Sequence, residues 1–287
     1  MDKEKIISAM GYLDPTLVGE AEAHLRPRRS VGKMALVAAC LCLALAGTAL
    51  AVGAALYEDF FTLEGQDAYY SVYTDSRMPL SAFASHIPEL ADSQGDGFME
   101  NMYLFDSWQA AEDFVGVDVM RNPLLEDAPI RPTFCADENG ENETKYNCAV
   151  RLATSGETGD LLSVDVETSL WVSPNGERGM EPGDQGGWLQ IMARMITEMN
   201  PYENGGGVGF LLDDLASLSR EEYMTASDRK AIITANACPD PDSGREPFYR
   251  YVAYLEVNGV FFALETGGAS HGGLGPEGLK QVLDAFS

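Results

Sequence analysis

The sequence has few of the residues that catalytic and metal sites most often use. It contains three widely separated histidines, His24, His86 and His271, and its five cysteines form no C-x-x-C pair. This pattern supplies no zinc-ligand set. The glycine run at 205–209 lacks the lysine of a phosphate-binding loop. We therefore expect no metal, no cofactor and no enzymatic activity.

Basic residues are also scarce, with 19 Lys and Arg against 45 Asp and Glu, a net charge of −26. Residues 1–33 hold six basic and five acidic side chains, a net of +1, so the rest of the chain carries −27. Such a field repels nucleic acid and other anionic polymers. The composition thus excludes a nucleic-acid partner and favours a soluble acidic domain.

Charge is missing altogether from one long run, the 23 residues Met34–Leu56. A helix of this length would be about 34 Å long, enough to cross a hydrocarbon core of about 30 Å. Four basic residues lie just before the run: Arg26, Arg28, Arg29 and Lys33. Because basic flanks stay in the cytoplasm, we expect a single span at the cell membrane, with the N-terminus cytoplasmic and residues 57–287 extracytoplasmic.

Two other interpretations of this run are open. Ala49-Leu50-Ala51 fits the small-x-small cleavage pattern of a signal peptide, and Cys40 could be the acylated cysteine of a lipoprotein. However, the 33 residues before the run and its length both exceed the usual signal peptide, and only six apolar residues precede Cys40. An uncleaved anchor is favoured.

The cytoplasmic head, residues 1–33, carries one apolar stripe at helical spacing. The stripe consists of Ile6, Met10, Leu13 and Leu17. Asp14-Pro15 interrupts the first helix and caps a second one. So small an element cannot bury its stripe alone, and it either binds a cytoplasmic partner or lies on the membrane surface.

Three cysteines follow the span: Cys135, Cys148 and Cys238. An odd number at wide spacing implies no disulfide framework, although a Cys135–Cys148 bridge remains open. The predicted extracytoplasmic part is long enough to bury a core without disulfides.

Residues 57–104 are expected to be largely irregular, with one strand at Ala68–Thr74. A helix follows, with Asp106 as its N-cap and Gly116 at its end. Lys145–Ala153 and Leu161–Trp171 both alternate apolar and polar residues, which predicts a hairpin.

Three further strands are predicted towards the C-terminus, at Lys230–Ala237, Phe248–Val257 and Val260–Glu265. Asn258-Gly259 between the last two is a strong hairpin signal. The strand before that turn is apolar on both faces, which predicts a central position in the sheet.

Two helices complete the expected elements. One would carry a stripe of Trp188, Ile191, Met192, Met195, Ile196 and Met199, and the other would cover the sheet over Pro276–Phe286. Glu203–Gly209 is a possible flexible joint. The predicted fold class of residues 105–287 is α+β, an antiparallel sheet with helices packed on one side.

Three short segments resemble catalytic or metal-binding motifs. Gly268–Gly272 matches the G-x-S-x-G nucleophile elbow at Ser270, but the only histidine from there on is the adjacent His271, which leaves the triad incomplete. Asp137–Glu143 and Asp240–Gly244 are acidic, yet neither has the spacing of a calcium-binding EF-hand loop. We interpret the two acidic segments as turns.

Residues 7–21 (ISAMGYLDPTLVGEA), the basic cluster and the span together resemble the anti-sigma-factor-like heads of Gram-positive single-pass membrane proteins. Residues 105–126 and 251–286 resemble a family of extracytoplasmic domains of unknown function that such proteins carry. The resemblance implies a bacterial envelope regulator whose outer domain senses a ligand and whose head holds a sigma factor. Alternatives are an envelope-binding module without signalling and an exported hydrolase that uses Ser270.

Overall fold

The computed structural model describes residues 56–62, 68–92, 102–136, 143–173, 187–201, 207–212, 215–238, 248–269 and 272–286. The chain divides into two compact units, Met1–Val52 and Gly53–Ser287, and all of these residues belong to the second. Residues 34–55 of the predicted span lie outside the described ranges. Within those ranges, no helix combines the length and apolar character needed to cross a membrane.

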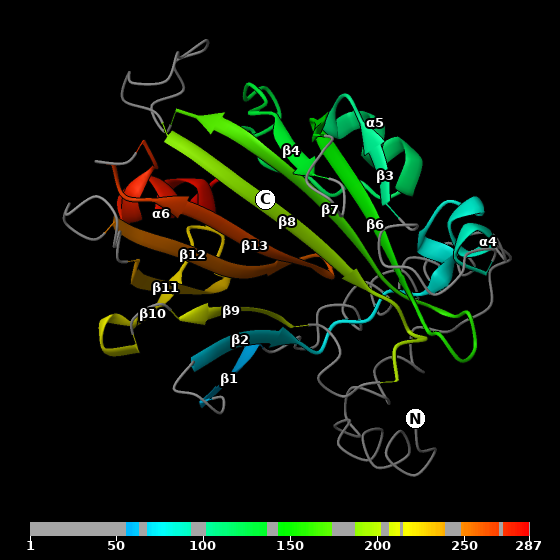
Figure 1. Cartoon of the computed structure of the whole chain (residues 1–287), viewed down its shortest axis with the longest axis horizontal. Coiled ribbons are helices and arrows are strands. Elements are labelled where there is room, and N and C mark those ends of the chain that lie inside the picture. The colour runs from blue at the N-terminus through cyan, green and yellow to red at the C-terminus, as the bar shows by residue number, and fades with distance from the viewer. Residues whose placement is uncertain are drawn as a thin grey trace, which may run out of the picture. The chain divides into compact units, whose positions relative to one another are not determined.

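The largest element is an eight-stranded sheet in the order β10-β11-β12-β13-β8-β7-β6-β3 (Figure 1). Every neighbouring pair of strands in it is antiparallel. Its strands are β3 (Met102–Phe105), β6 (Cys148–Thr154), β7 (Leu161–Val172), β8 (Gly187–Ile196), β10 (Ser219–Met224), β11 (Lys230–Cys238), β12 (Phe248–Val257) and β13 (Val260–Gly267).

Two smaller antiparallel sheets accompany it. The first, which we call the small sheet, consists of β1 (Leu56–Thr62), β2 (Ala68–Thr74) and β9 (Val208–Leu212), and the second pairs β4 (Thr133–Ala136) with β5 (Glu143–Tyr146). The helices are α4 (His86–Asp92), α5 (Trp108–Val115), α6 (Gly275–Asp284) and the short 3-10 helices η1 (Leu80–Ala82) and η2 (Leu215–Ser217).

One face of the large sheet is covered by α4, α5 and α6, and the main core lies between these helices and the sheet. The helices contribute Ile87 from α4, Ala111 and Val115 from α5, and Leu279 and Val282 from α6, all essentially inaccessible to solvent. The sheet contributes alternate residues along each strand, among them Val150, Val166, Ile191, Leu264 and Leu255. This surface is called the helix-covered face below.

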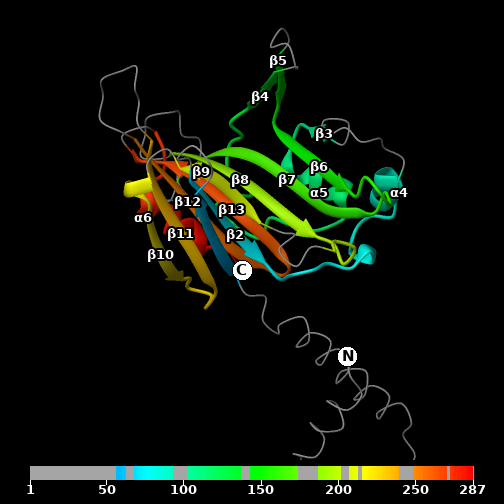
Figure 2. The same cartoon turned by 60° about the horizontal axis from the view of Figure 1, so that its bottom comes forward.

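The opposite face of the large sheet is covered at β11, β12 and β13 by the small sheet (Figure 2). A second core fills that space, with Tyr70, Val72 and Phe210 from the small sheet against Ile232, Tyr254 and Phe261 from the large one. The domain is therefore a mostly antiparallel β structure with a few short helices.

Several predicted elements are confirmed. The Ala68–Thr74 and Phe248–Val257 strands have the predicted bounds, and the latter is central, paired with β11 and β13. Asn258 and Gly259 form the turn between β12 and β13, with φ of 52° and 83°. Such positive φ angles are those that a two-residue hairpin requires, which explains the choice of asparagine and glycine.

The helix after Phe105 is present, but its N-cap is Ser107 rather than the predicted Asp106. The Ser107 hydroxyl accepts a hydrogen bond from the amide of Ala110, and Gly116 ends the helix in the left-handed conformation. Since an N-cap side chain reaches the amide three residues ahead, the cap position fixes the first turn as Trp108–Ala110.

The predicted helix over 188–199 is wrong, because these residues form β8 and the turn that follows it. Leu189, Ile191, Ala193 and Met195 are fully buried on the helix-covered face, and the side chains between them point the other way. Trp188 and Met192 of β8 are apolar too and lie on the opposite face of the sheet. The sequence pattern therefore fitted a helical stripe as well as a strand. Pairing with β7 and β13 on both sides decides for the strand.

Residues 57–104 are more ordered than the sequence predicted, since β1, α4 and β3 lie there besides β2. Leu56, the predicted last residue of the span, is the first residue of β1 and is paired with Thr74. Val208 and Gly209, at the end of the suggested joint, belong to β9 and pair with β2. Residues 203–206 lie outside the described ranges.

Candidate functional site

The face of the large sheet that carries the second core changes character at β6, β7 and β8. Among the described residues, the small sheet contributes to the core over β11–β13, whereas no residue of β6 or β7 belongs to that second core. On β6, β7 and β8 this face presents Arg151, Asp165, Glu167 and Arg194, whose side chains are 12% to 27% exposed. We call this region the open half.

Strand register brings these four side chains together. Arg151 of β6 lies opposite Asp165 of β7, which lies opposite Arg194 of β8. Glu167 is two residues further along β7 and therefore on the same face. The four groups form two ion pairs in adjacent positions, and their charges cancel.

The Arg194–Asp165 pair is bidentate. The guanidinium donates from Nε to Oδ1 at 2.7 Å and from Nη2 to Oδ2 at 2.6 Å, the fork geometry of a strong charge-assisted contact. The Asp165 carboxylate raises the pKa of Arg194, which therefore stays charged. Nη1 donates to the carbonyl of Gly207, so the same side chain also ties β8 to the start of β9.

The second pair joins Arg151 Nη2 to Glu167 Oε2 at 3.2 Å. Burial raises the pKa of Glu167, and the guanidinium of Arg151 opposes that rise. The carboxylate is therefore held in a place that water reaches poorly, as the groups of both structural ion pairs and functional sites are.

A groove of about 330 Å³ lies over these pairs. Its rim includes apolar side chains, Ala153, Leu162 and Met192, and the amide-bearing Asn200. The volume falls at the lower end of the range for small-molecule sites. The two ion pairs form the floor of this groove. They offer hydrogen-bond donors and acceptors side by side without net charge.

The same face continues along β7 and β8 to two tryptophans. Trp171 and Trp188 are register partners near the ends of these strands, and the guanidinium of Arg131 lies 5.8 Å and 5.5 Å from their ring centroids. Six residues separate Asp165 from Trp171, which is about 20 Å of strand. The open half is therefore an elongated strip, with ion pairs at one end and two tryptophans beside a guanidinium at the other.

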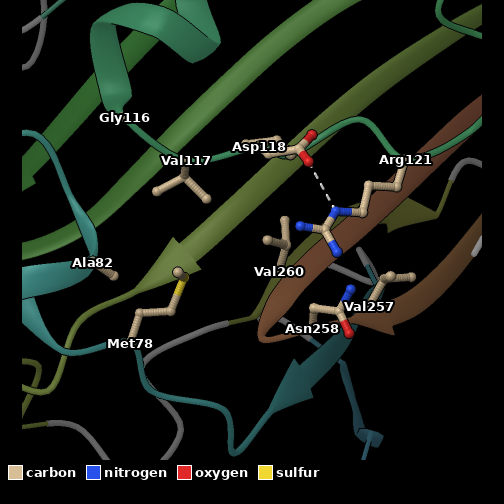
Figure 3. Close-up of a pocket in the computed structure, with 10 residues that line it drawn as sticks. Met78, Ala82, Gly116, Val117, Asp118, Arg121, Val257, Asn258 and Val260 are labelled. Atoms are coloured by element: carbon tan, nitrogen blue, oxygen red, sulfur yellow. Dashed lines mark hydrogen bonds and ion pairs between the residues drawn. The ribbon is translucent and has the colours of Figure 1, made fainter.

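A second hollow of about 250 Å³ lies beside the β12–β13 turn (Figure 3). Arg121 and Asp118 face each other across it with Nε and Oδ2 at 3.0 Å, and Asn258 lies close by. Both charged side chains are at least half exposed, so the pair is weak and screened. This hollow offers less recognition chemistry than the groove of the open half.

The glycines next to the G-x-S-x-G segment have a structural role. Gly187, Gly267 and Gly273 meet there so closely that a Cβ on Gly187 or Gly273 would overlap the backbone of another of the three, and one on Gly267 would lie tightly against the Trp188 ring. Trp188 donates its amide to the carbonyl of Gly272 at 3.0 Å. Glycine is therefore needed for the crossing itself, while Ser270 and His271 lie outside the described residues.

The disulfide left open by the sequence does not form, because Cys148 carries a free thiol that is buried on the helix-covered face. Burial raises its pKa to about 12. The buried Cys238 is also a free thiol. Neither cysteine belongs to the candidate site.

The other predicted site residues lie outside the part of the chain that the structure describes. They are the stripe Ile6, Met10, Leu13 and Leu17, the basic cluster Arg26, Arg28, Arg29 and Lys33, and Met34 at the start of the span. Asp137–Asn142 and Asp240–Gly244 lie outside it too. Within it, no group of three or more His, Cys, Asp or Glu side chains is arranged to hold a metal ion.

A sequence pattern for the open half exists, although it was not among the predictions above. On the predicted hairpin strands, the positions that alternate with Val150, Val164 and Val166 are Arg151, Asp165 and Glu167. Charged residues at such regular positions mark a face without an apolar cover. Arg194 was hidden because its strand had been predicted as a helix.

Comparisons with protein-family models, with curated proteins and with solved structures found no match.

Proposed function

We propose that this protein is a membrane-anchored binding protein of the bacterial envelope, whose open half holds an elongated, uncharged polar ligand, a neutral oligosaccharide. The observation that carries the proposal is the groove over two half-buried ion pairs. The span at Met34–Leu56 would anchor the protein with its N-terminus in the cytoplasm and this domain outside. The α+β class of the domain rests on α4, α5 and α6, which pack on the helix-covered face of the large sheet.

The chemistry of the strip supports this ligand class. Both carboxylates and both guanidinium groups of the floor are paired, so a charged ligand would have to break an existing pair. The net charge of −27 beyond residue 33 also repels anionic polymers. Sugar hydroxyl groups donate and accept hydrogen bonds, which matches the paired floor, and sugar rings stack on aromatic side chains such as Trp171 and Trp188.

A sterically blocked groove tests the proposal. Ala153 is exposed on the groove rim, and Ala153→Trp would fill the space without removing any polar group. Ala226 is equally exposed in the turn after β10, so Ala226→Trp is the matched control. The measurement is calorimetric titration of the full-length protein in detergent with oligomers of N-acetylglucosamine and of glucose.

We expect one oligomer series to bind the wild type and Ala226→Trp alike, and Ala153→Trp to lose at least about tenfold in affinity because the indole occupies the site. Absence of binding to the wild type, or equal binding by both variants, would overturn the proposed ligand.

The cytoplasmic head gives a further part of the proposal, a signal to a cytoplasmic regulator such as a sigma factor. It rests on the apolar stripe, which needs a covering surface, and on the resemblance to anti-sigma-like heads. Capture experiments with tagged residues 1–33 test it, with Met10→Asp as the variant that should abolish capture. If no cytosolic protein is retained, the alternative of an envelope-binding module without signalling is favoured.

A further inference from the structure

The small sheet has an outer face that points away from the second core and is rich in aromatic side chains. Because Tyr70, Val72 and Phe210 are buried against the large sheet, the alternate residues of the same strands point outwards. The outward residues include Tyr57 and Phe61 of β1, Tyr69 and Tyr73 of β2, and Leu211 of β9. We call these five residues the aromatic face.

The rings of the aromatic face are arranged in two pairs that span neighbouring strands. Tyr57 and Tyr73 are register partners with stacked rings 5.3 Å apart, and Phe61 and Tyr69 are register partners with centroids 5.2 Å apart. Leu211 lies opposite Tyr69 on the other side, and its side chain is 54% exposed. The face therefore extends across all three strands.

Two glycines allow the tyrosine rings to lie over the sheet. A Cβ at Gly207 would overlap the ring of Tyr73, and one at Gly209 would overlap the ring of Tyr69. The missing side chains at and before the start of β9 leave room for the rings. Both glycines belong to the run at 205–209 noted in the sequence, and here they make room for the two tyrosine rings.

Chain continuity would restrict what the aromatic face can meet. Leu56 is both the predicted last residue of the membrane span and the first residue of β1, so under the proposed topology no linker would separate the span from the small sheet. The strand from Tyr57 to Phe61 extends over about 13 Å at 3.3 Å per residue. Interfacial headgroup regions are about 5–7 Å thick on each side of a bilayer, so a directly connected sheet must lie at that surface.

We propose that the aromatic face rests on the outer lipid interface of the membrane that anchors the protein. This inference rests on the proposed topology, with the span at Met34–Leu56. Tyrosine and phenylalanine suit this layer because their rings enter the headgroup region while the tyrosine hydroxyl groups remain hydrated.

The charge of this region favours a zwitterionic interface over a second copy of the chain. Asp59 is exposed between the two ring pairs, opposite Ser71. At a self-association surface with two-fold symmetry the Asp59 carboxylates of both copies would be brought into one desolvated layer, which is costly. At the headgroup level the carboxylate stays hydrated near the ammonium groups of zwitterionic lipids.

Tryptophan fluorescence in lipid provides the test. Leu211→Trp places a reporter on the aromatic face, and Met224→Trp places one at an equally exposed site, 58% accessible, on the β10 edge of the large sheet. Both full-length variants are reconstituted in phosphatidylcholine vesicles, with and without phosphatidylcholine brominated near the headgroup. The wild type supplies the background emission of its three native tryptophans.

We expect brominated lipid to remove about half of the added emission of Leu211→Trp and to leave that of Met224→Trp unchanged, since only the first reporter lies in the headgroup layer. Protease protection of residues 1–33 inside the same vesicles reports the topology separately. Quenching that is absent or equal in both variants, with that protection intact, would overturn the docking proposal alone. Failure of the protein to integrate into the vesicles would overturn the topology of the proposed function.

Discussion

The covered and the open halves of the large sheet present the same face of one antiparallel sheet, yet the first carries apolar side chains and the second carries ion pairs. Under the small sheet this face carries Ile232, Val252 and Phe261, each at most 4% exposed. On β7 and β8 it carries Asp165, Glu167 and Arg194. A strand only alternates its side chains, so the cover that lies over them decides which residues are compatible with folding.

This contrast limits the surfaces of the domain that could carry a binding site. The helix-covered face and the covered half are packed cores, in which a polar group without a partner would destabilise the fold. The open half keeps charged groups that satisfy one another while remaining within reach of a ligand. A groove over such groups is therefore the part of the sheet that is free to serve binding.

The largest expected effect comes from shortening one side chain in each half. Ile232→Ala removes a fully buried side chain from the second core, and we expect a loss of about 3–4 kcal/mol in the free energy of unfolding. Leu162→Ala makes the same change in size at the groove rim and should cost only about 1 kcal/mol. Urea unfolding followed by tryptophan fluorescence measures both, and equal losses would show that the open half is packed like the covered one.

The ion pairs of the open half can be broken individually. Asp165→Asn leaves the Arg194 guanidinium without its carboxylate, and since both side chains are partly exposed we expect a loss of about 1–2 kcal/mol. The double variant Asp165→Leu and Arg194→Leu removes both charges. Its loss in the free energy of unfolding should be smaller than the losses of the two single Leu variants added together. Strict additivity in urea unfolding would contradict a coupled pair.

The change in stability that we expect to be smallest comes from the titration of Cys148, which β6 carries on the helix-covered face. Because burial raises the pKa of Cys148 to about 12 from its ordinary value of 9.0, the unfolded chain loses this proton at a lower pH than the folded one. Stability that the protonated thiol contributes is therefore complete below pH 9 and declines between these two values.

The test for Cys148 compares the wild type with Cys148→Ala. The stability difference between them should shrink by about 1 kcal/mol between pH ~8 and ~10, since only the wild type carries this thiol. Other groups that titrate in this range, including Tyr254, are present in both proteins. A difference that does not change with pH would mean that the thiol is accessible to water in the folded state.

Local signals predicted the parts of the fold that depend on a few neighbouring residues. The Asn258-Gly259 turn, the strands on either side of it and the apolar stripe of α6 could be predicted because turn conformation and the pattern of apolar residues are properties of short segments. β8 was misread because its residues are apolar on both faces, which short-range periodicity does not distinguish from a helix. Its identity depends on β7 and β13, which are distant in sequence.

The candidate site was predicted less well for a related reason. Arg151, Asp165 and Arg194 come from three strands, and their pairing depends on register between segments that are up to 43 residues apart in the chain. The span and its basic flank, by contrast, can be read from consecutive residues, and the topology drawn from them stays a prediction.

By itself, the sequence determined the acidic composition, the isolated histidines and cysteines, the tight β12–β13 turn and the pattern of the central strand, because each is a matter of composition or of adjacent residues. Only the tertiary structure decided that β8 is a strand, that three glycines meet at one crossing, and that half of one sheet face lies under a second sheet while the other half bears ion pairs. Contacts between distant segments set these features, since the solvation of a side chain depends on what covers it.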